Sequence, residues 1–156
     1  MTFENKLLQK LAETTSAGER HEITISQGAW TAHLIFDRRD ELSGRLREVT
    51  LHRNGAAEGS VQDWAERVAK RVVGLLEPLK VVEVDAVRQQ ALLRSAAPTA
   101  KGENLFFYEV VLRGTANAVF RRFQGTQQPG KPREQIAFAL THESLAKLVA
   151  DVTAEK

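Results

Sequence analysis

The sequence lacks cysteine entirely among its 156 residues, which excludes disulfides, thiolate metal sites and cysteine nucleophiles. This absence agrees with a reducing compartment, and we expect a cytoplasmic protein. No apolar stretch approaches the roughly 20 residues that a membrane-spanning helix needs, so no membrane contact is expected. The segment from Met1 to Lys6 has no basic region followed by an apolar block, so we expect no secretory signal there.

An excess of one charge sign is also absent. The 22 Lys and Arg residues against 20 Asp and Glu residues give a formal net charge of +2. This surplus is too small to imply nucleic-acid binding by itself. The hydrophobic fraction of 42% and the charged fraction of 27% are ordinary for a globular protein. The length predicts one domain, residues 1–156, with one core.

The motifs of common enzymes are missing as well. There is no Gly-x-Ser-x-Gly sequence and no glycine-rich phosphate loop. No HExxH or HxH spacing occurs among the only four histidines, which are His21, His33, His52 and His142. We therefore predict no catalytic residue, no metal site and no cofactor. An enzyme with a dispersed site is an alternative that one sequence does not expose.

What the chain does contain is a weak internal repetition. A run from Glu22 to Phe36 resembles one from Glu109 to Phe123, and the offset is 87 residues at both ends (109 − 22 and 123 − 36). Each run is followed by a polar loop, a further strand and an amphipathic helix. We interpret the chain as two pseudo-repeated β-rich halves, 20–77 and 79–154. A chance match between two β-rich segments is the alternative.

Hydrophobic periodicity predicts three helices, at about 3–13, 61–76 and 142–154. The second is the clearest, because Ser60 can cap its first N–H groups and one apolar stripe runs along it. That stripe comprises Val61, Trp64, Ala65, Val68, Val72, Leu75 and Leu76. Alternation of apolar and polar residues predicts about 7–8 strands, three before this helix and five after it.

The predicted element order is α-βββ-α-βββββ-α. Hairpin-length connections favour a mainly antiparallel sheet, and the predicted fold is α+β, with three helices covering one face of a curved sheet. The order resembles that of small secretion chaperones, which run helix, three strands, helix, two strands, helix. The resemblance is loose: no motif carries it, this chain has additional strands, and it is mildly basic where such chaperones are typically acidic.

Arginine is the polar residue with the most functional interest. Arg121 and Arg122 are neighbours at the end of a predicted strand, so alternation sends them to opposite faces and one of them must lie on or beside an apolar face. A guanidinium there can contact a ligand anion. The candidate binding residues are Arg113, Arg121, Arg122 and Arg133. The alternative is that the neighbouring pair only rims the apolar face or pairs internally with Glu109 or Glu134.

The sequence favours a non-enzymatic binding or assembly module, acting through its sheet or a helix face as a homodimer or with a protein partner. The reasons are the missing catalytic motifs and more apolar strand faces than three short helices easily cover. The alternative is a sheet surface that binds nucleic acid or another anion through its arginines. Aromatic residues at 106–108 lie beside this basic segment, but the RNP1 pattern of RNA-binding sheets is absent.

Overall fold

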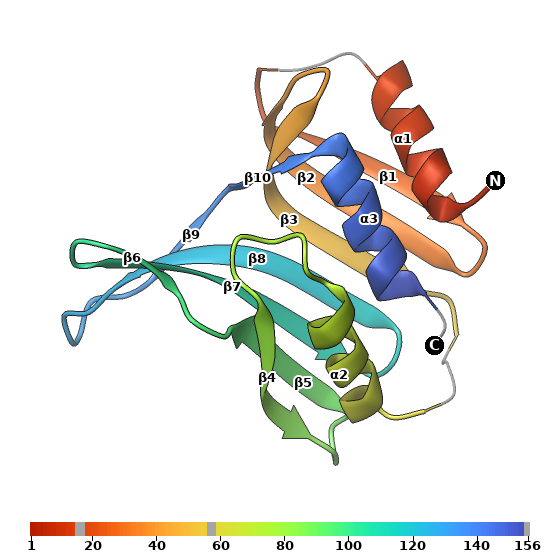
Figure 1. Ribbon diagram of the computed structural model, residues 1–156. Helices are drawn as coiled ribbons and strands as arrows, with labels where there is room; N and C mark the ends of the chain where they lie inside the picture. The colour runs from red at the N-terminus through yellow and green to blue at the C-terminus, as the bar shows by residue number, and fades with distance from the viewer. Residues whose placement is uncertain (15–17, 56–58, 155–156) are drawn as a thin grey trace.

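A computed structural model describes residues 1–14, 18–55 and 59–154 of the chain (Figure 1). The helices are α1 (Phe3–Glu13), α2 (Val61–Arg71) and α3 (His142–Thr153). The strands are β1 (His21–Gln27), β2 (Trp30–Arg39), β3 (Ser43–Arg53), β4 (Leu79–Asp85), β5 (Gln90–Ser95), β6 (Thr99–Lys101), β7 (Asn104–Arg113), β8 (Asn117–Thr126), β9 (Glu134–Ile136) and β10 (Phe138–Thr141). The predicted α+β fold with a curved antiparallel sheet is confirmed.

All ten strands belong to one antiparallel sheet, whose main order is β1-β2-β3-β8-β7-β5-β4. Figure 1 shows the three helices on the same side of this sheet, with α1 and α3 side by side over β1–β3 and α2 over β4 and β5. Among the described residues, no helix covers the opposite face. Beyond the helices, β6 with the adjoining ends of β7 and β8 projects from the body as an arm (Figure 1).

Each helix begins at a hydroxyl residue that accepts a hydrogen bond from a backbone N–H three residues on. Thr2, Ser60 and Thr141 are these N-caps. The apolar stripe of each helix then faces the sheet, with Leu7 of α1, Trp64 of α2 and Val149 of α3 buried. The Trp64 indole N–H also donates to the carbonyl of Val152 at 3.2 Å, which joins α2 to the end of α3. None of the helices is both long and apolar enough to span a membrane, as far as the described residues go.

The second helix is shorter than predicted, since it ends at Arg71 rather than at 76. Val72 still donates to the carbonyl of Val68, but its ψ of 96° turns the chain into an extended path. Val72 remains buried, whereas Leu76 is 78% exposed. The extended path places Glu77 in the interior, where the polar centre described below holds it.

The sheet has ten strands instead of the predicted 7–8. One of the additional strands is β6, in the segment between β5 and β7, and it pairs with the beginning of β7. Strand β5 starts only at Gln90, because the Asp85 carboxylate accepts hydrogen bonds from the N–H groups of Val87 and Arg88 and so forms a turn after β4.

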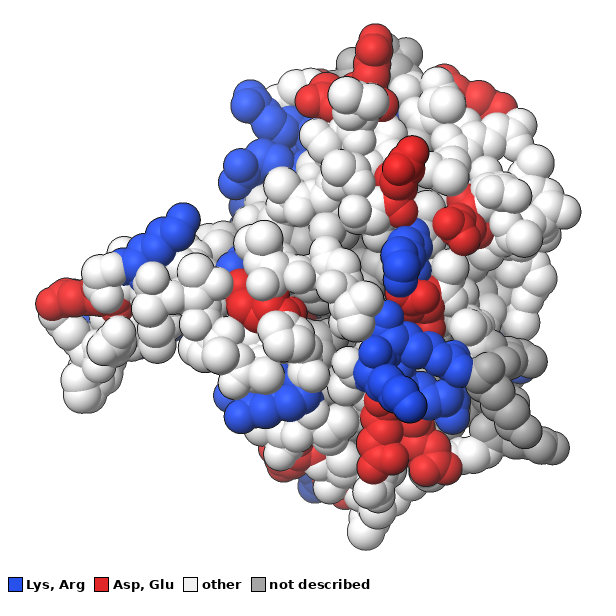
Figure 2. Space-filling model, viewed as in Figure 1, with Lys and Arg blue, Asp and Glu red and all other residues white. Residues whose placement is uncertain are grey.

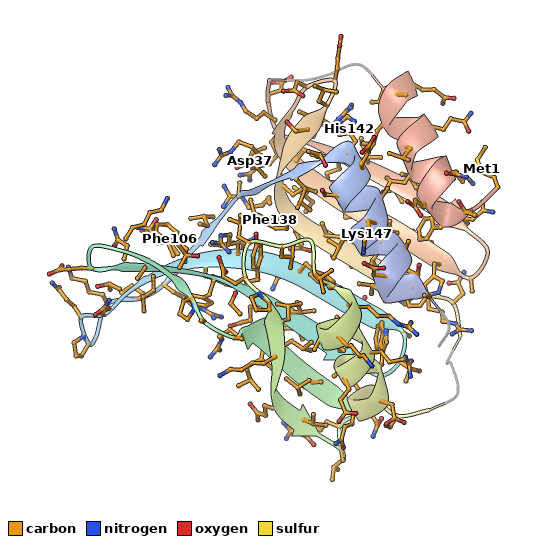
Figure 3. The ribbon with its side chains drawn as sticks, viewed as in Figure 1. Met1, Asp37, Phe106, Phe138, His142 and Lys147 are labelled. Atoms are coloured by element: carbon orange, nitrogen blue, oxygen red, sulfur yellow. The ribbon has the colours of Figure 1, made fainter. Side chains whose placement is uncertain are left out.

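The last predicted strand is divided into β9 and β10 because β3 and β8 diverge. These two strands pair only from Val49–Phe120 to His52–Asn117. Where β3 and β8 no longer pair with each other, β9 pairs with residues 122–124 of β8 and β10 pairs with residues 43–46 of β3. Phe138 at the start of β10 is buried there (Figure 3). Consecutive strands pair as β1-β2-β3 and as β7-β8-β9. The pseudo-repeat relation between the two halves stays a prediction.

Replacing the central side chain of α2 tests this packing. Trp64→Ala should lower the free energy of unfolding by about 3–5 kcal/mol, because it removes a large buried side chain and leaves a cavity. Urea unfolding followed by circular dichroism measures the change. Leu76→Ala, at an exposed position after the helix, should change stability by less than about 0.5 kcal/mol. Equal effects of the two substitutions would contradict the assignment of the buried stripe.

Candidate functional site

The two neighbouring arginines of β8 point to opposite faces, as the alternation predicts. Arg122 shares the helix-covered face with Phe120 and is almost fully buried, with 6% of its side chain exposed. Arg121 lies on the other face, where its side chain is 40% exposed. The two guanidinium groups therefore act in separate environments.

Arg122 forms a buried ion pair with Glu77 from the segment between α2 and β4. Its Nη1 and Nη2 each donate to one oxygen of the carboxylate at 2.9 Å. The hydroxyls of Ser95 and Thr99 donate to the same two oxygens at 2.8 and 2.7 Å. The Arg122 guanidinium carbon lies 4.2 Å from the centroid of the Tyr108 ring. We call these five residues the Glu77 centre.

The Glu77 carboxylate is held in its ionised form. Burial alone would raise its pKa, but hydrogen bonds from Arg122, Thr99 and Ser95 outweigh burial, so the pKa of Glu77 lies below its ordinary value. Four hydrogen bonds occupy the two oxygens of this carboxylate. The centre thus ties the chain after α2 to β5, β6 and β8.

On the sheet face opposite the helices, charged residues form a row across four strands. Arg94 of β5 lies opposite Glu109 of β7, and Glu109 lies opposite Arg121 of β8. Arg121 in turn donates to Glu48 of β3 at 3.0 Å. The sequence Arg94, Glu109, Arg121, Glu48 therefore alternates in sign along the row. We call it the charged row.

Glu109 is the most enclosed member of the charged row. Arg94 donates to it at 3.0 Å, and Arg133, which directly precedes β9, donates to both of its oxygens. Burial would raise the pKa of Glu109, but the hydrogen bonds from Arg133 and Arg94 lower it below the ordinary value. Arg133 also lies over the ring of Phe123, 4.0 Å from its centroid.

Apolar side chains lie on both sides of the charged row. Leu92, Val111 and Val119 are direct neighbours across β5, β7 and β8, and each is half-buried. On the other side, the rings of Phe107 and Phe123 stack with centroids 5.9 Å apart. We call the surface formed by the charged row, these three aliphatic residues and this aromatic pair the helix-free face.

The four arginines predicted to bind an anion do not converge on one site. Arg122 faces the helices, whereas Arg113, Arg121 and Arg133 belong to the opposite side. Carboxylates of the same chain pair with Arg121, Arg122 and Arg133. Arg113 is exposed at the end of β7 and, within the described ranges, has no ion-pair partner. The histidines are likewise dispersed, and the described residues include no group of three or more His, Asp or Glu that could hold a metal ion.

The residue that sequence reasoning missed is Glu77. It follows an apolar run and precedes Pro78, so it reads as the end of a helix. Its position directly before a proline, which favours extended backbone, was the available signal. No known protein family, curated protein or solved structure matches this chain. The geometry alone therefore has to indicate what the protein does.

Removing the charge of Glu77 tests the centre. Glu77→Gln should lower the free energy of unfolding at pH 7 by roughly 3–5 kcal/mol, because it leaves the Arg122 charge buried and uncompensated. Because folding lowers the pKa of Glu77, its contribution is complete above the unfolded value of about 4.5 and is lost as pH falls through the folded value.

Urea unfolding between pH 7 and pH 3 measures both effects. The difference between the wild type and Glu77→Gln should narrow as the pH falls below about 4.5. Glu83→Gln, at an exposed position on β4, is the matched control and should change stability little at pH 7. If the difference in stability between the wild type and Glu77→Gln stays constant down to pH 3, Glu77 is not an ionised partner of Arg122.

Proposed function

We propose that this protein is a non-enzymatic assembly module whose helix-free face packs against a second copy of the chain. The observation that carries the proposal is the one-sided covering of the sheet. Helices bury one face, while the other presents Leu92, Val111 and Val119 at positions where a solvated strand normally places polar residues. Burying these side chains between two copies removes apolar surface from water and favours association.

The shape of the surface supports a protein partner. A shallow hollow of about 190 Å³ lies beside the aliphatic residues and is bordered by Glu83, Gln90, Leu92 and Val111. Across the charged row, Phe107 is half-buried and adds some apolar surface, whereas its stacking partner Phe123 is 9% exposed and lies beneath Arg133. Aromatic and aliphatic side chains surrounded by polar groups are typical of the centre and rim of protein interfaces.

The alternation of charge in the charged row favours a second copy over other partners. In an interface with two-fold symmetry, the same surface meets itself in the opposite direction. An alternating row can then place the arginines of one copy opposite the glutamates of the other, which favours one register of association. The charged row together with Arg133 contains three arginines and two glutamates. The net charge of this surface is therefore close to zero.

This near neutrality gives less support to a nucleic-acid-binding face. Affinity for a polyanion comes mainly from cations that can neutralise phosphates. Arg121 and Arg133 already pair with Glu48 and Glu109, so a phosphate would have to displace these carboxylates. Arg122 is enclosed on the other side of the sheet. Of the four predicted arginines, only Arg113 has no ion-pair partner among the described residues.

A charge placed within the aliphatic residues tests the proposal. The wild type should sediment as a dimer at micromolar concentration, and Val111→Lys should sediment as a monomer, because a lysine there would be buried without a partner in the interface. Sedimentation velocity gives the mass, and circular dichroism shows that the variant is folded. Val87→Lys, on the exposed β4–β5 turn, is the control and should remain dimeric. A monomeric wild type, or a Val111→Lys variant that stays dimeric, would refute the proposal.

A further inference from the structure

An arginine pair at the end of the β2–β3 hairpin lies outside both the Glu77 centre and the helix-free face as defined above. Arg38 of β2 and Arg45 of β3 are direct cross-strand partners, and both side chains are exposed. Like charges directly opposite each other destabilise a pair of strands. Neither guanidinium forms an ion pair with any carboxylate in the described part of the chain. Nearby, Arg20 and Arg47 both pair with Asp37.

An open cleft of about 450 Å³ adjoins this pair, and its lining includes Arg38, Arg45, Ser43 and Ala139. Its volume lies within the range of small-molecule sites, roughly 300–1,000 Å³. Ala139 of β10 is the partner of Arg45 on the other side of β3, and its small side chain leaves the space beside the guanidinium open. Figure 2 shows a group of Lys and Arg atoms at the upper left, over this end of the hairpin.

The other charges around the cleft are already engaged. Arg39 points to the helix-covered face, where it donates to the carbonyls of Leu11 and Thr14 at 3.0 and 3.2 Å and so binds the end of α1. Asp40 accepts hydrogen bonds from the N–H groups of Leu42 and Ser43, each at 2.8 Å, which fixes its carboxylate in the turn.

Two exposed carboxylates, those of Glu19 and Glu41, lie close by in the sequence. Neither forms an ion pair with Arg38 or Arg45 within the part of the chain that the structure describes. No direct ion pair with a described carboxylate therefore compensates either arginine. The Asp40 carboxylate also lines the cleft and repels an anion, so a bound anion has to lie on the arginine side, away from Asp40.

We propose that Arg38 and Arg45 bind the phosphate group of a small phosphate monoester in this cleft. Each guanidinium offers a planar fork of N–H donors that matches two phosphate oxygens. A monoester carries close to two negative charges at neutral pH and three terminal oxygens, so one phosphate compensates both arginines. It also removes their mutual repulsion. The remaining volume of the cleft accommodates the organic part of the ligand. This site is independent of the self-association proposed above.

Isothermal titration with phenyl phosphate at constant ionic strength tests the site. The wild type should bind one equivalent per chain, and inorganic phosphate should compete. Arg38→Ala and Arg45→Ala should each weaken binding roughly tenfold or more, because each removes one charge-assisted fork. Arg38→Lys should fall between the wild type and Arg38→Ala, because a lysine keeps the charge but not the fork. Arg113→Ala, which removes another exposed arginine of the sheet, should bind like the wild type.

Four results would overturn the proposal. The first is no saturable binding of phenyl phosphate by the wild type. The second is an equal loss in Arg113→Ala, which would indicate a general charge effect. The third is binding of a short single-stranded DNA without binding of phenyl phosphate, which would assign the arginines to a phosphodiester backbone. The fourth comes from a thermal melt without ligand, which separates binding from folding. Arg38→Ala should be at least as stable as the wild type, because the repulsion between the two arginines is gone. A clear loss of stability would mean that Arg38 has a structural role.

Discussion

The buried pair between Glu77 and Arg122 is the interaction on which the rest of this architecture depends. Taking both charges out of water costs several kcal/mol per ion, and the two-fold hydrogen bonding from Arg122 together with the hydroxyls of Ser95 and Thr99 offsets that cost. To reach this position the chain must leave helix α2 at Arg71 and run extended into β4. The same contacts place β6 beside the core and so fix the base of the arm. One polar centre thus determines where a helix ends and where an additional strand begins.

Pairing within the chain also determines what the surface of the sheet can do. On the helix-free face, arginines and glutamates alternate and compensate one another, and the apolar surface beside them comes from Leu92, Val111 and Val119. Such a surface suits a second protein copy better than a polyanion. Arg38 and Arg45 differ because no carboxylate among the described residues pairs with them. The two proposals, self-association and phosphate binding, therefore concern separate parts of the sheet.

Local sequence signals predict much of this fold. The features that these signals miss depend on contacts between residues far apart in the sequence. Helix caps, apolar stripes and strand alternation identify the three helices, most strands and the division of Arg121 and Arg122 between two faces. The ion-pair partners of these two arginines could not be predicted in this way, because Glu48 lies 73 residues from Arg121 and Glu77 lies 45 residues from Arg122. Likewise β6 is a strand because β7 pairs with it, and β9 and β10 are separate because β3 and β8 diverge. No short sequence window contains this information.

We propose that two copies meet through the helix-free face, and distances between the two copies test this arrangement. Because the chain has no cysteine, a single introduced cysteine carries a spin label at one known position. Gln90 is exposed on β5 beside Leu92, whereas Glu66 is exposed on α2. We expect a short, narrow distribution of label-to-label distances between copies for Gln90→Cys and a clearly longer one for Glu66→Cys. A longer distance for Gln90→Cys than for Glu66→Cys, or no dipolar coupling at either position, would contradict it.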